Sequence, residues 1–511
     1  MSSFPVSLSL VLPLLLFTAA VPILCRWRYA QLINGAALTL SVIGVLAPPL
    51  LPAPLQQEIS TAIWGHASFA IQAIAVLVTF LAFILAHYSE HYLAGEPRQA
   101  QYIGNFQLTI GSVLLVVLAN HLGAIIVGWI AISLGLHRLL LFYPTRTRAV
   151  LAAHKKFLLA RVAEIALVVA GLLLYVEYGT WQMDALMEAV ASSKPSLLAQ
   201  IAAVLLAQAA LIKCAQLPLH GWLIQVVEAP TPVSALLHAG VINLGGVLLI
   251  LFAPLLSQVQ LAQWWILIVA GISTTIAVSV MSVETNVKAQ LAWSTSAQMG
   301  LMLMECALGL YHLALLHLLA HSCYKAWSFL AAGTRVVRPH QRPAPALWMA
   351  PLAGSLATAI VVSVPHALDS GMTLSSRALL AALLFALVLE ALVSKKAPRL
   401  LMASFAGLGM VLLYAGLEHT SAKVVGVTAT IPGSSADLWA SSLIAGMVLL
   451  WWIVRQFGGY PAGAWLQHKL YRGLYLDEWF TRATLRLCPV RLPNTLALAT
   501  PKPNTTTQEC L

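Results

Sequence analysis

Long apolar stretches follow one another along almost the whole chain, and short polar loops separate them. The first stretch runs from about residue 4 to residue 24, and the last from about 437 to 455. A transmembrane helix needs about 20 mostly apolar residues, and stretches of this length recur throughout. The pattern predicts an all-α polytopic membrane protein with about 13–15 transmembrane helices.

The polar positions divide this series into four parts. We predict N-terminal transmembrane helices at 1–105 and a core at 106–335 that carries most of the buried ionisable groups. A Pro/Arg-rich segment at 335–345 separates this core from plainer C-terminal transmembrane helices at 336–456. The remainder, 457–511, mixes aromatic and basic residues, as an interfacial amphipathic helix or a partner-docking surface does.

The charge balance supports a membrane protein and not a nucleic-acid-binding protein. Of the 511 residues, 60% are hydrophobic and only 9% are charged, although the net charge is +11. No basic face with interleaved aromatics is visible, so we predict no nucleic-acid partner. The first apolar stretch has no basic residue before it, which favours an uncleaved span with its N-terminus outside. Basic residues then fall on alternate loops, which predicts a cytoplasmic tail. On that side lie Arg26, Arg28, Arg98, Arg146, Arg148, Lys155, Lys156, Lys288, Arg335, Arg338, Arg342, Lys395, Lys396 and Arg399, with Arg455, Lys469, Arg472, Arg482 and Arg486 in the tail.

Ionisable residues and prolines interrupt the apolar pattern near the middle of the chain. Lys213 is followed by Pro218, and Glu228 is followed by Pro230 and Pro232. Ionisable groups at membrane depth are costly and typical of ion or proton paths. Proline-broken helices are tolerated there where protein or a water-filled cavity satisfies the backbone. The alternatives are a lysine that snorkels to the interface and a carboxylate in a wet loop.

Three titratable residues recur at helical spacing on a later apolar stretch. His317, His321 and Lys325 stand at i, i+4 and i+8, so they share one helix face. With His238 on an earlier span, they suit a proton relay. The alternatives are satisfied core histidines or a two-histidine zinc site, which would need a third ligand.

Other ionisable residues are weaker candidates for the same path. Arg161 and Glu164 are i and i+3 neighbours that either pair with each other or act on a nearby group. Lys288 opens a helix, and Glu305 and Glu390 are single carboxylates in apolar helices. The six cysteines are scattered, and the sequence carries no phosphate-binding, haem or iron–sulfur motif. We expect no cofactor or metal in this chain, and no enzymatic activity of its own.

Four segments resemble the antiporter-like membrane subunits of respiratory complex I and of multi-subunit cation/proton antiporters. They are residues 213–218, 230–239, 288–300 and 317–326. The resemblance covers about residues 80–335 and implies two inverted five-helix repeats, each with a discontinuous helix at mid-membrane. It also implies that 106–335 is a proton-translocation core, whose path is lined by Lys213, His238, His317, His321 and Lys325.

The chain departs from that pattern in two places. Those subunits usually read Gly-Trp-Glu on the fifth helix, and the glutamate partners the lysine matching Lys213. Here the run ends in Ile130, so the carboxylate is missing. Glu228 is the candidate replacement, because it stands beside the prolines where those subunits carry a small residue. The late broken helix with its lysine is not recognisable after residue 350.

The run 228–232 and the tail run 474–480 are similar to one branch, the membrane subunit of the DAB inorganic-carbon accumulation complex of bacteria. This resemblance implies a subunit in the bacterial cytoplasmic (inner) membrane, in contact with membrane lipid, that conducts a proton or sodium ion down its gradient. It also implies a cytoplasmic partner resembling a β-carbonic anhydrase, which holds the zinc and traps CO2 as bicarbonate. The alternatives are a cation/proton antiporter or complex I-type subunit, and a non-conducting membrane anchor.

Overall fold

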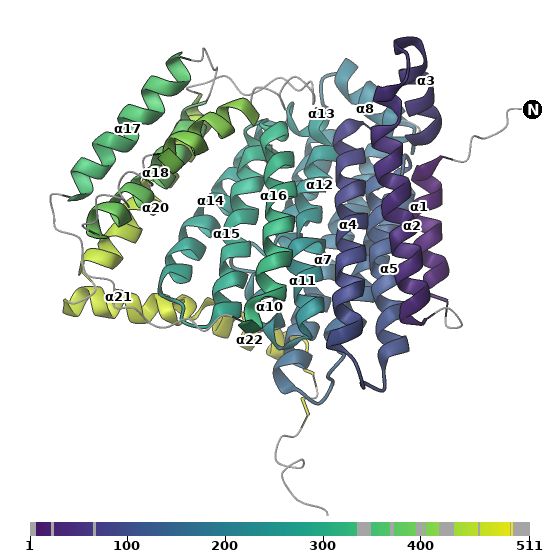
Figure 1. The fold of residues 1–511 in the computed structure, drawn as a ribbon, viewed down its shortest axis with the longest axis horizontal. Coiled ribbons are helices and arrows are strands. Elements are labelled where there is room, and N and C mark those ends of the chain that lie inside the picture. The colour runs from purple at the N-terminus through teal and green to yellow at the C-terminus, as the bar shows by residue number, and fades with distance from the viewer. Residues whose placement is uncertain are drawn as a thin grey trace, which may run out of the picture.

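Helices form most of the described chain in the computed structural model (Figure 1). The structure describes residues 7–21, 25–64, 68–334, 349–367, 373–394, 402, 405–417, 434–457, 460–490 and 492–493. No β-strand occurs in these ranges apart from an isolated bridge between His121 and Gln182. The predicted all-helical class is confirmed. The predicted break at 335–345 lies outside the described residues.

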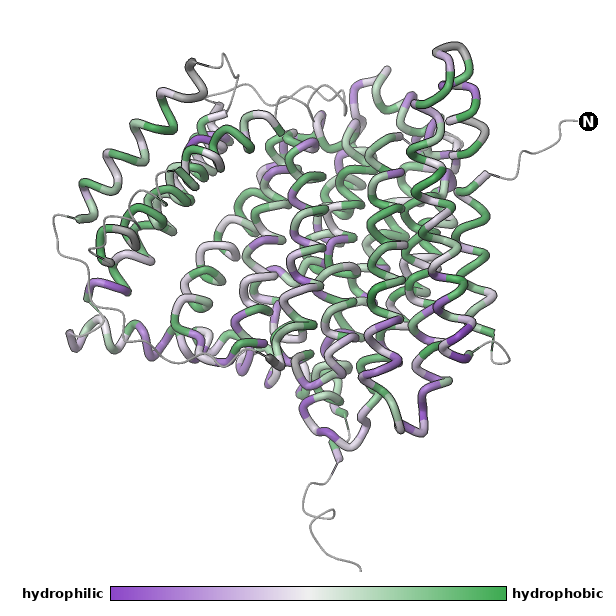
Figure 2. The backbone as a smooth tube through the Cα atoms, viewed as in Figure 1, coloured by the Kyte–Doolittle hydropathy of each residue, from purple (hydrophilic) through white to green (hydrophobic). Residues whose placement is uncertain are grey.

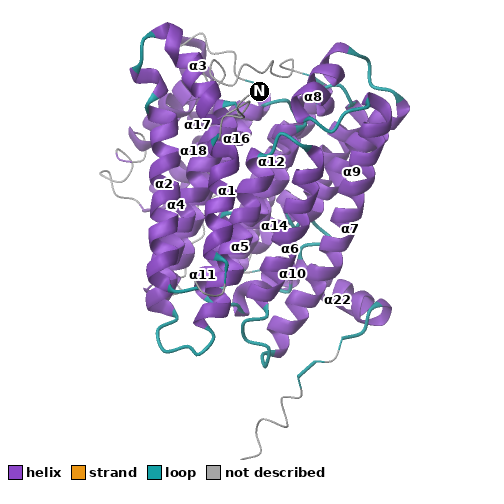
Figure 3. Ribbon diagram, turned by 90° about the vertical axis from the view of Figure 1, so that its right-hand side faces the viewer, coloured by secondary structure: helices purple, strands orange, loops and turns teal. Residues whose placement is uncertain are grey.

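The first half of the chain forms a bundle of long helices that stand side by side (Figures 1 and 3). α3 and α8 lie at one end of this bundle, and α22 lies at the other. The helices of this half are α1 (Leu8–Ala19), α2 (Trp27–Leu46), α3 (Ala53–Trp64), α4 (Phe69–Tyr92), α5 (Gln99–Leu118), α6 (Leu122–Leu140), α7 (Thr147–Tyr178), α8 (Met183–Ser192) and α9 (Leu197–Lys213).

The second half continues the bundle and then lays two helices across one end of it (Figure 1). The helices that continue it are α10 (Gly221–Gln225), α11 (Thr231–Ala239), α12 (Leu244–Leu251), α13 (Ala253–Leu256), α14 (Gln260–Val283), α15 (Val287–Ala307), α16 (Tyr311–Leu330), α17 (Met349–Ala367), α18 (Leu374–Ser394) and α20 (Ser435–Phe457). Those that cross the end are α21 (Pro461–Tyr471) and α22 (Leu476–Leu487).

Length and hydropathy identify the membrane-spanning part of the bundle. In the described ranges, eight helices are long and apolar enough to cross a membrane, and five shorter apolar helices accompany them. Most helices are hydrophobic over most of their length (Figure 2). Large apolar side chains such as Ile165, Val176 and Leu134 are exposed on the outer faces of these helices. In a membrane these faces would contact lipid chains. The chain is therefore a multi-pass membrane protein.

The helix that begins with α9 is broken at mid-chain. α9 ends at Lys213, Ala215 has a positive φ of 50°, and Pro218 prevents the helix from continuing. Neighbouring helices satisfy the freed backbone. Ser273 Oγ accepts the Leu217 N–H at 3.0 Å, and Ser296 Oγ donates to the Ala215 carbonyl at 3.1 Å. Such breaks occur at membrane depth only where protein or a cavity surrounds them.

The next helix is interrupted in the same layer. Pro230 precedes α11 and Pro232 lies in its first turn, where a missing N–H costs no hydrogen bond. α11 ends at Ala239, Gly240 follows as its C-cap, and a short 3-10 segment, η4 (Val241–Asn243), leads into α12. A Cβ on Gly245 would lie 2.4 Å from the Cys214 sulfur, so glycine lets α12 approach the broken α9 closely. The two breaks are therefore neighbours.

The tail docks on the bundle end nearest to the broken helix. Leu474 and Tyr475 both have positive φ values and turn the chain between α21 and α22. Lys155 Nζ then donates to Asp477 Oδ1 at 2.6 Å, and Gln225 Nε2 donates to Asp477 Oδ2 at 2.6 Å. A Cβ on Gly221 would overlap Asp477 Oδ1, at 1.5 Å. α22 therefore fits closely against α7 and α10.

Two lysines that we counted as cytoplasmic loop residues prove to be buried. α7 begins at Thr147 and runs to Tyr178, so Lys155 and Lys156 lie inside the helix. Lys155 is 0% exposed and Lys156 is 5% exposed. The prediction of loop positions was wrong, because the helix extends beyond the apolar stretch and its first turns are covered by packed protein.

Candidate functional site

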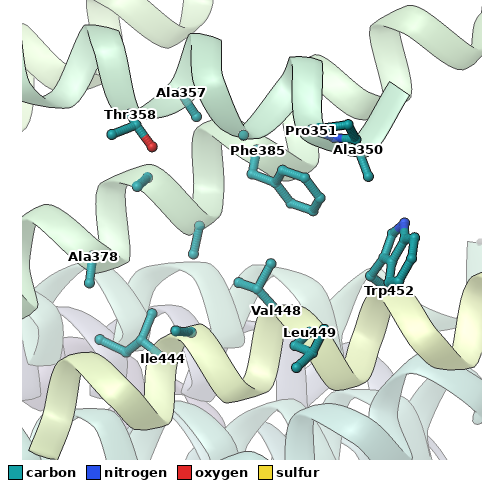
Figure 4. A pocket seen from close by; sticks show the side chains of 14 residues that line it. Ala350, Pro351, Ala357, Thr358, Ala378, Phe385, Ile444, Val448, Leu449 and Trp452 are labelled. Atoms are coloured by element: carbon teal, nitrogen blue, oxygen red, sulfur yellow. The ribbon is translucent and has the colours of Figure 1, made fainter. Parts of the chain in front are cut away.

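One pocket in the described part of the chain offers no ionisable group. It has a volume of about 540 Å3 and lies between α17, α18 and α20. Phe385 and Trp452 point into it, and its other lining residues are small or aliphatic apart from Thr358 (Figure 4). Such a lining suits a lipid chain and carries no ion chemistry. Most of the predicted site residues gather elsewhere, in two clusters.

The first cluster surrounds Lys213, and we call it the lysine cluster. A cavity of about 20 Å3, with room for one water molecule, is lined by Lys213, Lys156, Glu164, Ser133 and Trp129. Lys213 Nζ lies 4.5 Å from the centre of the Trp129 ring, which stabilises an ammonium through its π face. α7 packs along α9, and this contact brings the two lysines and the carboxylate to one cavity.

Hydrogen bonds hold the charged groups of the lysine cluster in place. Lys156 Nζ donates to the Ser133 carbonyl at 2.6 Å and to its Oγ at 3.2 Å. Arg161 Nη2 donates to Glu164 Oε1 at 2.7 Å and to Ser133 Oγ at 3.1 Å. The predicted Arg161–Glu164 pair therefore forms, and Glu164 also lines the cavity of Lys213.

The second cluster centres on α16, and we call it the histidine cluster. His238 Nδ1 and Thr295 Oγ1 share a hydrogen bond of 3.1 Å, and the His238 ring stacks on Phe329 at 4.3 Å between centroids. The His321 Nδ1 atom lies 2.6 Å from Gln298 Oε1, and its Nε2 atom lies 3.3 Å from the His238 carbonyl oxygen. The side chains of His238 and His321 are both buried.

The other members of the histidine cluster extend along the same helix. Lys325 is fully buried, and its Nζ donates to the Leu291 carbonyl at 3.0 Å. The rings of His317 and His321 are 6.2 Å apart between centroids. His317 Nδ1 lies 3.1 Å from both carboxylate oxygens of Glu305. The spaced residues thus form a ladder along α16 that ends on a carboxylate.

The comparison with known proteins matches the part of the chain that contains both clusters. The transmembrane family described as NADH:quinone oxidoreductase/Mrp antiporter covers residues 119–349. A probable inorganic carbon transporter subunit DabB of Hydrogenovibrio crunogenus is 48% identical over 431 residues, which are 82% of this chain and 82% of that protein. The chain belongs to the DabB family.

Further relatives place the DabB family in a wider group. A probable inorganic carbon transporter subunit DabB2 of Halothiobacillus neapolitanus is 34% identical over 82% of this chain and 79% of its own length. The Mrp complex from Dietzia sp. contains a chain with 19% identity and a TM-score of 0.62, which covers 94% of this chain and 60% of that one. The predicted antiporter-like fold and membership of the complex I and Mrp superfamily are confirmed.

Glu228 does not lie where the sequence analysis of this DabB-family chain placed it. Its carboxylate pairs with Arg148 at 3.6 Å, its side chain is 35% exposed, and Arg146 donates to its carbonyl at 3.1 Å. It does not line the cavity of Lys213, whereas Glu164 does. This corrects the hypothesis that Glu228 replaces the missing carboxylate. The broken helix carries Glu228 to the bundle end, while Glu164 lies at mid-length of α7.

The remaining predicted residues lie between or beside the clusters. Lys288 Nζ donates to Thr231 Oγ1 at 3.1 Å, near the bundle end that α22 covers. Val241 and Ile242 of η4 line the lysine-cluster cavity, and the next residue, Asn243, donates to Ser322 Oγ at 2.6 Å. Ser322 follows His321 on α16, so η4 connects the two clusters.

Several members of both clusters were not predicted from the sequence. Lys156 precedes Glu164 by eight residues, so helical spacing alone could have placed the two on one face. Thr295 and Gln298 stand three residues apart on α15, so helical spacing could likewise have placed them on one face. Glu305 was named as a weaker candidate, but neither its pairing with His317 nor the contacts of Ser133 could have been predicted, because the partners lie on other helices.

The histidines and carboxylates of the two clusters do not converge on one point in the described part of the chain. In the ranges that the structure describes, no three His, Cys, Asp or Glu side chains lie close enough to hold a metal ion. His317 and Glu305 are the two such groups that meet in the histidine cluster, and Lys325 completes that ladder with a donor-only ammonium. The arrangement suits the transfer of protons between fixed titratable groups.

Proposed function

We propose that this chain is the membrane subunit of an inorganic-carbon uptake complex and that it conducts a cation down its gradient. The cation is a proton or sodium, and its passage drives a cytoplasmic carbonic-anhydrase-like partner that holds zinc. Two relatives of high coverage are named as probable inorganic carbon transporter subunits. The observation that carries the proposal is the pair of buried ionisable clusters joined through η4.

The proposed route uses groups from both clusters. It includes Lys213 with Glu164 in the lysine cluster, and His238 with the ladder of α16 in the histidine cluster. Ion flow can drive a partner only if the ion binds unequally to two coupled conformations of the complex. The docked tail offers a physical link, because α22 contacts both α7 and α10 at the end of the broken helix.

Uptake of labelled inorganic carbon tests the proposal in cells that express this chain together with its partner. We expect Lys213→Ala to reduce uptake at least about tenfold, because the cavity loses its ammonium. Lys194→Ala serves as a matched control, since Lys194 is exposed in the loop between α8 and α9. If Lys213→Ala takes up inorganic carbon at the wild-type rate and this uptake is still sensitive to an uncoupler, the route is excluded.

A cation/proton antiporter is the second candidate. The NADH-quinone oxidoreductase subunit L of Mycobacterium tuberculosis is 32% identical over 52% of this chain and 42% of its own length. Cation–proton exchange in vesicles that lack the partner would favour this function.

A non-conducting membrane anchor is the third candidate. The missing carboxylate at Ile130 is compatible with it. In that case only variants of the tail would lose uptake of inorganic carbon.

A further inference from the structure

The ladder on α16 ends at a carboxylate that the proposed route does not yet use. Glu305 lies in the last turn of α15 and His317 in the second turn of α16. Gly309, with φ of 72°, turns the chain between these helices and brings the two side chains together. Their side chains are only 13% and 16% exposed, and both oxygens of Glu305 lie 3.1 Å from the His317 Nδ1 atom.

A second small cavity lies on the other side of this pair. It has a volume of about 20 Å3 and is lined by Glu305, Ser375, Ser376 and Tyr414, together with apolar side chains from α15, α16 and α20. A buried water needs about this much space and two to four polar partners. The cavity has room for one water molecule, and a carboxylate residue and three hydroxyl-bearing residues are among those that line it.

The two serines of this cavity belong to a group of hydrogen-bonded side chains at one end of the bundle. Thr373 Oγ1 donates to Ser376 Oγ at 3.0 Å and lies 3.1 Å from Ser375 Oγ. Asp437 accepts the backbone N–H groups of Leu374 at 2.9 Å and of Ser375 at 2.8 Å. Asp437 therefore fixes the first turn of α18 and orients its serines at the cavity.

The position of Asp437 shows which end of the bundle this is. Asp437 lies in the first turn of α20, a helix of 23 residues that ends at Phe457, shortly before α21 begins. A helix of that length is about 35 Å long, so Asp437 lies at the end opposite to α21 and α22. The ladder on α16 is about 12 Å long from His317 to Lys325, and it runs away from Asp437 toward the end that α21 and α22 cover.

We propose that Glu305 and this serine-lined cavity form the outer mouth of the path and that the ion that enters is a proton. The inference rests on the proposed function and deepens it. A protonated water in the cavity gives its proton to the Glu305 carboxylate. Glu305 then passes a proton to His317 Nδ1, which leaves a carboxylate and an imidazolium, and the imidazolium passes its charge along α16. A sodium ion would need several oxygen ligands at each step, and this ladder continues with imidazole and ammonium groups.

The test uses the whole complex in proteoliposomes with a pH-sensitive dye inside. We expect Glu305→Gln to lower proton flux at least about tenfold, because the amide keeps the size but cannot carry a proton. Glu305→Asp should recover a substantial part of the flux. Glu177→Gln is the matched control, since Glu177 is an exposed carboxylate at the end of α7. Ser376→Leu, which fills the cavity, should also block flux.

The outcomes separate this inference from the proposed function. If wild-type complex carries neither protons nor labelled sodium, the proposed function fails. If Lys213→Ala blocks flux but Glu305→Gln and Ser376→Leu leave it unchanged, the outer mouth is wrong and the proposed function stands. If labelled sodium enters without a dye response, the assignment of the proton is wrong. Should Glu305→Gln fail to assemble, Ser376→Leu decides the question.

Discussion

At the scale of single residues, the lysine cluster carries more positive than negative groups. Lys156, Arg161 and Lys213 surround one cavity region with Glu164 as the carboxylate that faces them. A buried charge without a counter-charge is costly, so Glu164 contributes to stability as well as to the path. The antiporter pattern would provide a second carboxylate, but that position is Ile130.

A charge-balance experiment follows from this excess. Glu164→Gln should destabilise the protein by about 3 kcal/mol, because removing one partner of a buried pair leaves its cations unpaired. Adding Lys156→Met should restore part of the thermal stability, since it removes one surplus cation, but should not restore carbon uptake. Melting of the detergent-purified complex measures the first effect and labelled uptake the second. Additive stability losses in the double variant would show that the two residues do not interact.

At the scale of helices, local patterns could be predicted and contacts between helices could not. The ladder of His317, His321 and Lys325 depends only on helical spacing, and it lies on one helix as predicted. Glu164 and Lys213 meet because α7 packs along α9, which no local pattern reveals. Glu228 was misplaced for the same reason, since its closeness to the broken helix in sequence does not fix its direction.

The docked tail helix gives a prediction at this scale. Asp477→Asn should release α22, because it removes the charge that pairs with the fully buried Lys155. Gly221→Ala should act in the same way by steric overlap with Asp477. We expect at least about tenfold faster amide hydrogen exchange in residues 476–487 of both variants. Glu478→Gln is the matched control, because Glu478 is exposed on the outer face of α22. If residues 476–487 of Asp477→Asn exchange their amide hydrogens as slowly as in the wild type, the Asp477–Lys155 pair does not hold α22 in place.

At the scale of the whole molecule, the direction of the path depends on which end faces the cytoplasm. Lys155 and Lys156 are buried, so they no longer count among the basic loop residues that favour a cytoplasmic tail. Arg98, Arg146 and Arg148 remain at the end of the bundle that α22 covers. The positive-inside rule still favours a cytoplasmic tail. With a cytoplasmic tail, the proposed outer mouth at Glu305 would face outward, and protons moving down their gradient would travel toward the tail side.

Cysteine labelling in intact cells tests this orientation directly. Cys488 is exposed beside α22, and Lys194 is exposed in the loop at the opposite end. In a background that carries Cys510→Ser, a membrane-impermeant maleimide should label Lys194→Cys in intact cells and Cys488 only after permeabilisation. Labelling of Cys488 in intact cells would reverse the topology. The Glu305 cavity would then face the cytoplasm, and a cation that enters the cell down its gradient would leave the path at that cavity and could not use it as its entrance.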